Sequence, residues 1–232
     1  MIYLNEYLEW AKKRGDRLNK YIKQTVRKQI RLHKKYIYRY DRVTQQIDWL
    51  QDNYYLTTGE LKQIELLPPQ KWWLELQLGY DMIDENGGQV QLTNEFFLQL
   101  GRGSGKSSYM GGRALAWMIL GNQWGGEGQV IAYDNNQARH VYGQIGNQTQ
   151  ASPLLTDMAE ANKFRSTKTG LLFEPMQTTF IKQTNDVNRA QGGNSSLNIF
   201  DEVHVYSDDI TEADNKGSRQ KQKNWQSIYI TS

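Results

Sequence analysis

The sequence predicts an α/β fold in which a mainly parallel β-sheet is covered by helices on both faces. A strand-like run from Phe96 to Leu100 is followed by a glycine-rich loop and a helix-like run from Ser108 to Leu120. Further strand-like runs alternate with a helix-like run, the strands at residues 129–133, 196–200 and 225–230 and the helix at residues 137–145. Alternation of strands and helices is typical of a parallel sheet between helical layers. The 232 residues suffice for one substantial domain with an appendage.

The glycine-rich loop has the composition of a phosphate-binding loop, and it lies in the proper setting between a strand and a helix. Its residues are Gly101-Arg102-Gly103-Ser104-Gly105-Lys106-Ser107. Glycines let backbone N–H groups turn inward around a triphosphate, the Lys106 ammonium can reach the outer phosphates, and the Ser107 hydroxyl can hold Mg²⁺. The next helix points its positive N-terminus at the anion. Leu100 stands where the usual motif has glycine, so the match begins at Gly101.

A second acidic motif lies about a hundred residues further on. The strand-like run from Ser196 to Phe200 ends in Asp201-Glu202, although Asn198 interrupts its apolar pattern. An acid at the carboxyl end of a parallel strand lies at the same sheet edge as the phosphate loop. Asp201 would then hold Mg²⁺, and Glu202 could polarise the attacking water as a general base. The two motifs, known as Walker A and Walker B, together predict a P-loop NTPase of the RecA-like (ASCE) class, with ATP and Mg²⁺ as ligands.

Composition excludes several other classes of protein. The chain has no cysteine, so disulfides and thiolate metal sites are excluded, and its three histidines are too scattered to suggest zinc. No apolar run approaches the ~20 residues that a membrane span needs. The first residues lack the basic-then-apolar order of a signal peptide. We therefore expect a cytosolic protein without a membrane partner.

Charge is distributed unevenly along the chain. Residues 1–50 contain 13 basic and 5 acidic residues, a net charge of +8, and the remaining 15 basic and 20 acidic residues give −5. Apolar residues at helical spacing predict an amphipathic helix from Leu18 to Ile37 and a second one from Val43 to Tyr54, with Asp41 as its cap. We predict a basic helical extension at residues 1–58 and an ATPase domain at 59–232. The basic face could be solvated, contact nucleic-acid phosphates or contact an acidic neighbouring subunit.

Four features in order resemble the large terminase subunit of tailed bacteriophages, the motor that packages DNA into the empty capsid. Gln70, in a Leu-Pro-x-Gln stretch before an aromatic helix and Gly79-Tyr80, resembles the adenine-reading segment of that family. The phosphate loop with its internal Arg102 and the acidic pair resemble its nucleotide site. The final segment Tyr229-Ile230-Thr231-Ser232 resembles its coupling strand.

This resemblance implies an ATPase that translocates double-stranded viral DNA into a procapsid. It implies that Arg102 senses the γ-phosphate, and that Arg189, or alternatively Arg219, completes a neighbour's site in a homo-oligomeric ring. Thr231 and Ser232 would couple hydrolysis to movement. The implied partners are the small terminase subunit and the portal protein, in the host cell cytoplasm.

The chain departs from the family in length, because large terminases usually continue into a C-terminal nuclease domain. We expect an ATPase part that is incomplete at its C-terminus, and no nuclease activity. Two alternatives stay open. Asp201-Glu202-Val203-His204 is also the acidic box of DExH helicases, so the chain could be the first lobe of such an enzyme. It could also be a fragment that binds nucleotide without turnover. A nucleotide kinase is less compatible with the acidic pair, which suits water activation.

Overall fold

The computed structural model folds into two compact units. The first consists of Met1–Gln51 and Glu65–Asn94, and the second of Asp52–Ile64 and Glu95–Ser232. The structure describes residues 1–101, 103–121, 123–132, 135–167, 170–184, 195–203 and 224–231, with only the backbone at 135–140 and 184. The predicted boundary between residues 58 and 59 does not coincide with these divisions. Residues 65–94 belong to the first unit, because the helix that begins at Pro68 packs on the first helix of the chain.

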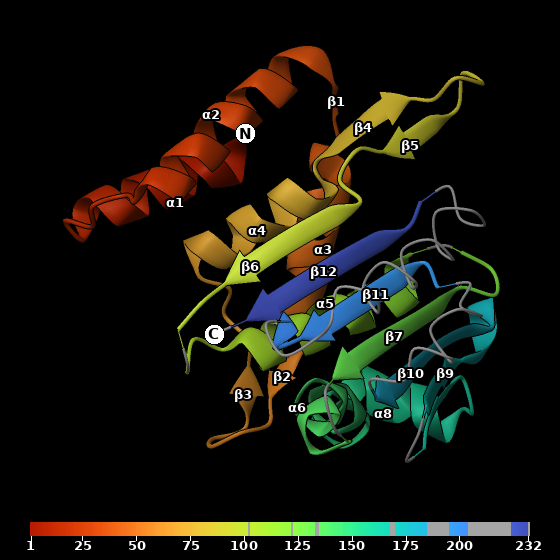
Figure 1. Ribbon diagram of the computed structural model, residues 1–232. Helices are drawn as coiled ribbons and strands as arrows, with labels where there is room; N and C mark the ends of the chain where they lie inside the picture. Colours follow the sequence, from red (N-terminus) through yellow and green to blue (C-terminus); the bar gives the residue numbers. More distant parts are fainter. Residues whose placement is uncertain are drawn as a thin grey trace. The chain divides into compact units, whose positions relative to one another are not determined.

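The first unit combines helices with a small antiparallel sheet (Figure 1). Its helices are α1 (Ile2–Lys13), α2 (Lys20–Lys35), α3 (Tyr40–Asn53, the last two residues of which count with the second unit) and α4 (Pro68–Leu78). Its sheet has the order β1-β4-β5, formed by β1 (Ile37–Tyr38), β4 (Tyr80–Ile83) and β5 (Gln89–Gln91). A turn at residues 84–88 joins β4 to β5 as an antiparallel hairpin.

An aromatic core holds the helices of the first unit together. The rings of Tyr7 and Trp72 stack with their centroids 4.5 Å apart, and Leu4 and Ala11 complete the buried cluster. Ile22 and Val26 on the apolar side of α2, together with Leu18 just before the helix, pack on this cluster. The apolar spacing that predicted an amphipathic helix therefore corresponds to a real packing surface.

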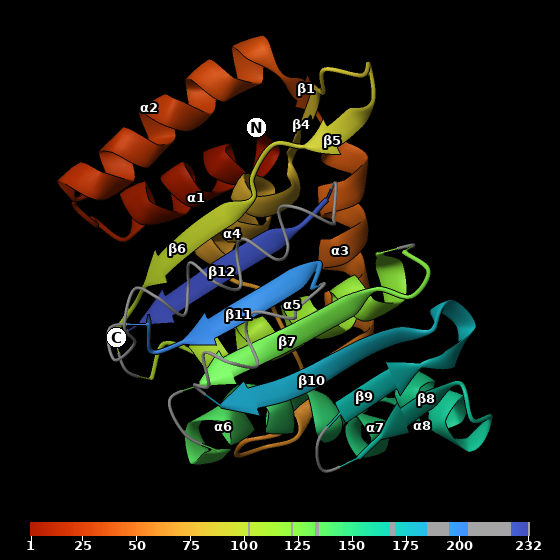
Figure 2. The ribbon, with the colours of Figure 1, turned by 45° about the vertical axis from the view of Figure 1, so that its right-hand side comes forward.

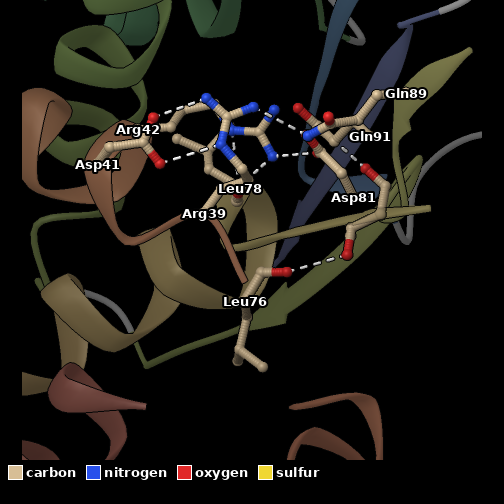
Figure 3. A network of polar contacts seen from close by, with 9 residues as sticks. Arg39, Asp41, Arg42, Leu76, Leu78, Asp81, Gln89 and Gln91 are labelled. Atoms are coloured by element: carbon tan, nitrogen blue, oxygen red, sulfur yellow. Dashed lines mark hydrogen bonds and ion pairs between the residues drawn. The ribbon is translucent and has the colours of Figure 1, made fainter. Parts of the chain in front are cut away.

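A network of charged side chains joins the start of α3 to the hairpin (Figure 3). Asp81 is 2% exposed; Arg39 Nη1 lies 3.0 Å from its Oδ2, Arg42 Nη2 lies 2.5 Å from its Oδ1, and Gln89 donates to Oδ2 at 2.9 Å. The prediction that Asp41 caps α3 is wrong, because the helix already begins at Tyr40. Asp41 instead pairs with Arg39 at 2.6 Å, and this hydrogen bond lowers the pKa of the Asp41 carboxyl to about 2.

The second unit is built on a seven-stranded sheet with the order β6-β12-β11-β7-β10-β9-β8. The parallel strands are β6 (Glu95–Gln99), β12 (Gln226–Thr231), β11 (Leu197–Asp201), β7 (Glu127–Ala132) and β10 (Thr178–Thr184). Their arrowheads point the same way in Figure 2, so their carboxyl ends form one edge. The predicted mainly parallel sheet is confirmed.

The remaining elements of the second unit complete its sheet and cover it. The antiparallel edge consists of β9 (Gly170–Phe173) and β8 (Phe164–Ser166). The chain turns from β9 to β10 through a 3₁₀ segment, Glu174–Met176, that contains Pro175. Helix α5 (Lys106–Leu120) packs against α6 (Asn135–Gly146), and α6 packs on β7 and β10. Two short helices, α7 (Gln148–Ala151) and α8 (Pro153–Glu160), and a two-stranded ladder of β2 (Tyr55–Leu56) and β3 (Lys62–Gln63) also belong to this unit.

Candidate functional site

The phosphate loop of the second unit has the backbone that its glycines predict. Gly103 and Gly105 have φ values of 76° and 78°, in the left-handed region that glycine adopts without a steric penalty. The Ser104 N–H donates to the carbonyl of Gly101 at 3.3 Å. Helix α5 begins at Lys106, two residues earlier than predicted, so that Lys106 and Ser107 both lie in its first turn. Free N–H groups at the start of a helix form a site for anions.

The acidic pair lies where the strand pattern predicted it. Strand β11 is buried along its whole length and ends at Asp201, which is 5% exposed. Glu202 follows with a φ of 56°, a left-handed conformation that is uncommon for a residue with a side chain. Such backbone conformations persist where the surrounding structure holds them, and they cluster at functional sites. The chain therefore turns sharply at Glu202, directly after the buried strand.

The two halves of the site meet through a direct ion pair. The Lys106 Nζ lies 3.3 Å from Glu202 Oε1, although the two residues are 96 positions apart in sequence. Lys106 is 9% exposed and Glu202 is 25% exposed. Burial of an ammonium is costly unless an anion accompanies it. The lysine is therefore held at the sheet edge by a carboxylate, at a position where a phosphate oxygen could take over the same role.

The predicted coupling strand lies between the two halves. The sheet order places β12 between β6, which leads into the phosphate loop, and β11, which ends in the acids (Figure 1). Thr231, at the end of β12, is buried, and its carbonyl accepts the N–H of Leu100 at 3.1 Å. A shift at the end of this strand would thus be felt at the first residue before the loop.

The other predicted site residues belong to the first unit or lie outside the described residues. Gln70 belongs to the first unit, where its Oε1 accepts the N–H of Leu67 at 2.9 Å at the start of α4. The predictions for Arg102, Arg189, Arg219 and Ser232 lie outside the described residues.

The sequence patterns did not predict that residues 52–64 support the beginning of α5. Tyr54 is fully buried in the second unit, and a Cβ placed on Gly111 of α5 would come within 2.8 Å of its hydroxyl. The Gln144 Oε1 accepts from the Ser108 hydroxyl at 3.5 Å and from the Thr57 hydroxyl at 3.3 Å. Residues 52–64 therefore brace the beginning of α5. Two glycines in succession inside a helix-like run, Gly111 and Gly112, were the available sign of such a close approach.

The fold and this site define a class of protein, the P-loop ATPases. Comparison with known proteins specifies the family. Residues 78–232 match the family described as the terminase large subunit, ATPase domain. The chain is also 68% identical over all of its 232 residues to the terminase large subunits of Lactococcus phages p2 and SK1. The chain belongs to the terminase large subunit family, and the part that matches is the ATPase domain.

A solved structure supports the fold. The chain resembles the large terminase of bacteriophage HK97 with a TM-score of 0.66 and 19% sequence identity, over 84% of this chain and 38% of that one. The chain spans 43% of the length of the two Lactococcus phage relatives. In the part of the chain that the structure describes, no helix is long and apolar enough to cross a membrane.

Proposed function

We propose that this chain is the ATPase part of a packaging motor, which hydrolyses ATP to drive double-stranded viral DNA into a procapsid. The observation that supports the proposal most directly is the Lys106–Glu202 ion pair at 3.3 Å, because it joins the phosphate-binding half and the water-activating half of one site. Membership of the terminase family favours this function over the helicase lobe and over a fragment without turnover.

In the proposed reaction the protein binds the phosphates of ATP, orients the attacking water and removes a proton from that water. Backbone N–H groups of residues 101–107 surround the phosphates, and Lys106 leaves Glu202 to neutralise the β- and γ-oxygens. Glu202, released from the lysine, accepts a proton from the attacking water. The exchange of partners means that nucleotide binding itself frees the general base.

The oxygen donors at the site fit Mg²⁺. The carboxylate of Asp201 lies at the strand end and the hydroxyl of Ser107 in the first turn of α5, and Mg²⁺ prefers one or two such oxygens together with phosphates and water. When bound, the ion would neutralise charge that develops on the phosphate oxygens. Oxygens of the nucleotide and of water would complete the ligand set.

The remaining roles rest on the family resemblance. Gln70 would read the adenine, Arg102 would sense the γ-phosphate, and Arg189 would act on a neighbour's nucleotide in a homo-oligomeric ring, with Arg219 as the alternative. Thr231 and Ser232 would pass the phosphate state to the part that moves DNA. The small terminase subunit and the portal protein would be partners in the host cytoplasm.

The test separates nucleotide binding from turnover. Lys106→Ala should weaken ATP binding, since the buried cation that meets the phosphates is lost. Glu202→Gln should bind ATP at least as tightly as the parent chain, because the amide no longer competes for Lys106, and should hydrolyse it about 10²–10⁴-fold more slowly. Binding is measured with a fluorescent ATP analogue and hydrolysis by phosphate release.

The control is Lys62→Ala, which removes an exposed lysine of β3 and should change neither quantity. Hydrolysis by Glu202→Gln at the parent rate would refute the assignment of the general base. Unchanged ATP affinity in Lys106→Ala would refute the phosphate site as a whole.

A further inference from the structure

Helix α2 has an unusual charge content for a helix in a folded unit. Its 16 residues contain seven lysines and arginines and no carboxylate. All seven side chains are exposed. We name this set the basic face of α2; its members are Lys20, Lys23, Arg27, Lys28, Arg31, Lys34 and Lys35.

The seven cations share one side of the helix. At 3.6 residues per turn, they occupy an arc of about 140°, and only Gln24 lies among them. The centre of the opposite side is Gln29, which is fully buried. The Gln29 Nε2 donates to Glu75 Oε2 at 2.9 Å, and its Oε1 accepts the Trp72 indole N–H at 2.6 Å. These hydrogen bonds fix the rotation of α2, so the basic face is held outward from its own unit.

No carboxylate neutralises this face within the described residues. Two acidic groups of the first unit have other partners or surroundings: Glu6 pairs with Lys71 at 3.1 Å, and Glu75 is buried beneath the helix. None of the ion pairs among the described residues includes a member of the basic face. Seven like charges on one helix repel one another. A polyanion that covers them would relieve this repulsion.

We infer that the basic face of α2 binds the sugar-phosphate backbone of duplex DNA without reading its sequence. The face extends for about 22 Å along the helix axis. One strand of B-DNA presents a phosphate every ~3.4 Å, or about six or seven over that length, a number close to the seven cations. This inference rests on the proposed function in one respect, namely that duplex DNA is the polyanion that the protein meets.

The composition of the face favours DNA over an acidic protein. Protein interfaces place aromatic and apolar anchors at their centre and deplete charged residues there. The arc has no apolar residue, and the exposed Tyr21 and Ile30 lie at its two borders. A surface of cations alone matches a rod of phosphates, whose binding depends on charge and the release of counterions.

The test measures the salt dependence of DNA binding by the full 232-residue chain, without nucleotide. Each phosphate contact contributes about 0.9 to the slope of log K against log salt concentration. Arg27→Gln with Arg31→Gln, at the middle of the arc, should reduce the slope by up to ~1.8. Glutamine forms helices about as well as arginine, so the fold should be retained, and circular dichroism checks this. Arg27→Lys with Arg31→Lys should keep the parent slope, because a phosphate accepts either cation.

The control variant, Lys62→Gln with Lys163→Gln, removes the same charge from exposed positions of the second unit and should leave the slope unchanged. An unchanged slope in the Arg27/Arg31 glutamine variant overturns the inference. Affinity for polyglutamate equal to that for a duplex of the same charge also overturns it, in favour of an acidic protein.

The inference and the proposed function can fail separately. ATP hydrolysis is measured on the same variants in the absence of DNA and should stay at the parent rate. A parent chain without hydrolysis but with the expected loss of slope would refute the ATPase and keep the DNA contact. Normal hydrolysis by the parent chain with an unchanged slope in the glutamine variant would keep the ATPase and refute the DNA contact.

Discussion

The left-handed backbone at Glu202 predicts an inverted order of stability for two substitutions. Glu202→Gly and Glu202→Ala both remove the carboxylate and its ion pair with Lys106. They differ only in whether a Cβ must occupy a φ of 56°. Comparison of the two variants therefore isolates backbone strain from the loss of the ion pair. We expect the glycine variant to be the more stable of the two.

The magnitude follows from two opposing terms. A residue with a Cβ pays about 1–2 kcal/mol in the left-handed region. Glycine returns about 0.5–1 kcal/mol of this, because it has more conformational freedom to lose on folding. The free energy of unfolding should thus be higher for Glu202→Gly by about 0.5–1 kcal/mol. In a chain of this size such a difference corresponds to a shift in Tm of about 1–4 °C.

Urea denaturation and thermal melting of the two variants measure this difference. The matched control is Asp157, an exposed residue inside α8 with ordinary helical geometry in the same unit. There Asp157→Gly should be less stable than Asp157→Ala by about 1 kcal/mol, the usual cost of glycine in a helix. If glycine were also the less stable choice at Glu202, the position would hold no strain and the reasoning would be refuted. Both Glu202 variants should lack hydrolysis, because both lack the carboxylate. The parent chain would then keep a strained backbone at this position for the sake of its catalytic side chain, at a cost in stability.

Two further substitutions test packing and ionisation in the second unit. Gly128→Ala should lower the free energy of unfolding by about 1–3 kcal/mol, because the new Cβ would lie 2.6 Å from atoms of both Phe180 and Trp117. The control is Gly143→Ala in α6, which has open space around it and should be neutral or stabilising. Urea denaturation of both variants measures the difference. Burial raises the pKa of Tyr142 to about 12, so its neutral form contributes fully below pH 10 and this contribution is lost between about pH 10 and 12. Stability of Tyr142→Phe, measured over that range, should fall less steeply than that of the parent chain, and an equal slope would contradict the pKa shift.

Local sequence carried most of the information about the nucleotide site. Glycines at Gly103 and Gly105 require one kind of backbone, and a buried run that ends in two acids defines a strand end. Because the carboxyl ends of parallel strands share one edge, these two local patterns implied that Lys106 and Glu202 would lie at the same edge of the sheet. Their shared location was predictable because ATP hydrolysis needs both halves of the site, whereas the direct ion pair between the two side chains was not predicted.

Other features depended on information that is not local. The insertion of β12 between β6 and β11 follows from the pairing of strands more than a hundred residues apart. The φ of Glu202 results from the surrounding structure, because the residue type disfavours it. Helix α1 was overlooked although Tyr3, Leu4, Tyr7 and Ala11 have helical spacing and are buried. Its partner α4 lies some sixty residues away in the sequence, so the local pattern did not show which surface the apolar face of α1 packs against.

Asn198 shows how an apparent defect in a sequence pattern can have a structural role. It interrupted the predicted strand, yet in the structure it is fully buried and directly opposite both Gln129 and Ser227. Its Oδ1 accepts from Gln129 Nε2 at 2.9 Å, and its Nδ2 donates to the Ser227 hydroxyl at 3.3 Å. A shift of either neighbouring strand by one residue would leave these buried groups unpaired, at about 1–3 kcal/mol each.

This polar ladder therefore helps to fix the register of β7, β11 and β12, in addition to the apolar side chains of these strands. Asn198 lies three residues before Asp201, and Ser227 lies four residues before Thr231. A fixed register at the ladder becomes a fixed position for both residues at the carboxyl edge. The ladder thus helps to hold Glu202, the residue after β11, within reach of the ammonium of Lys106, so buried polarity in the sheet supports the geometry of the site.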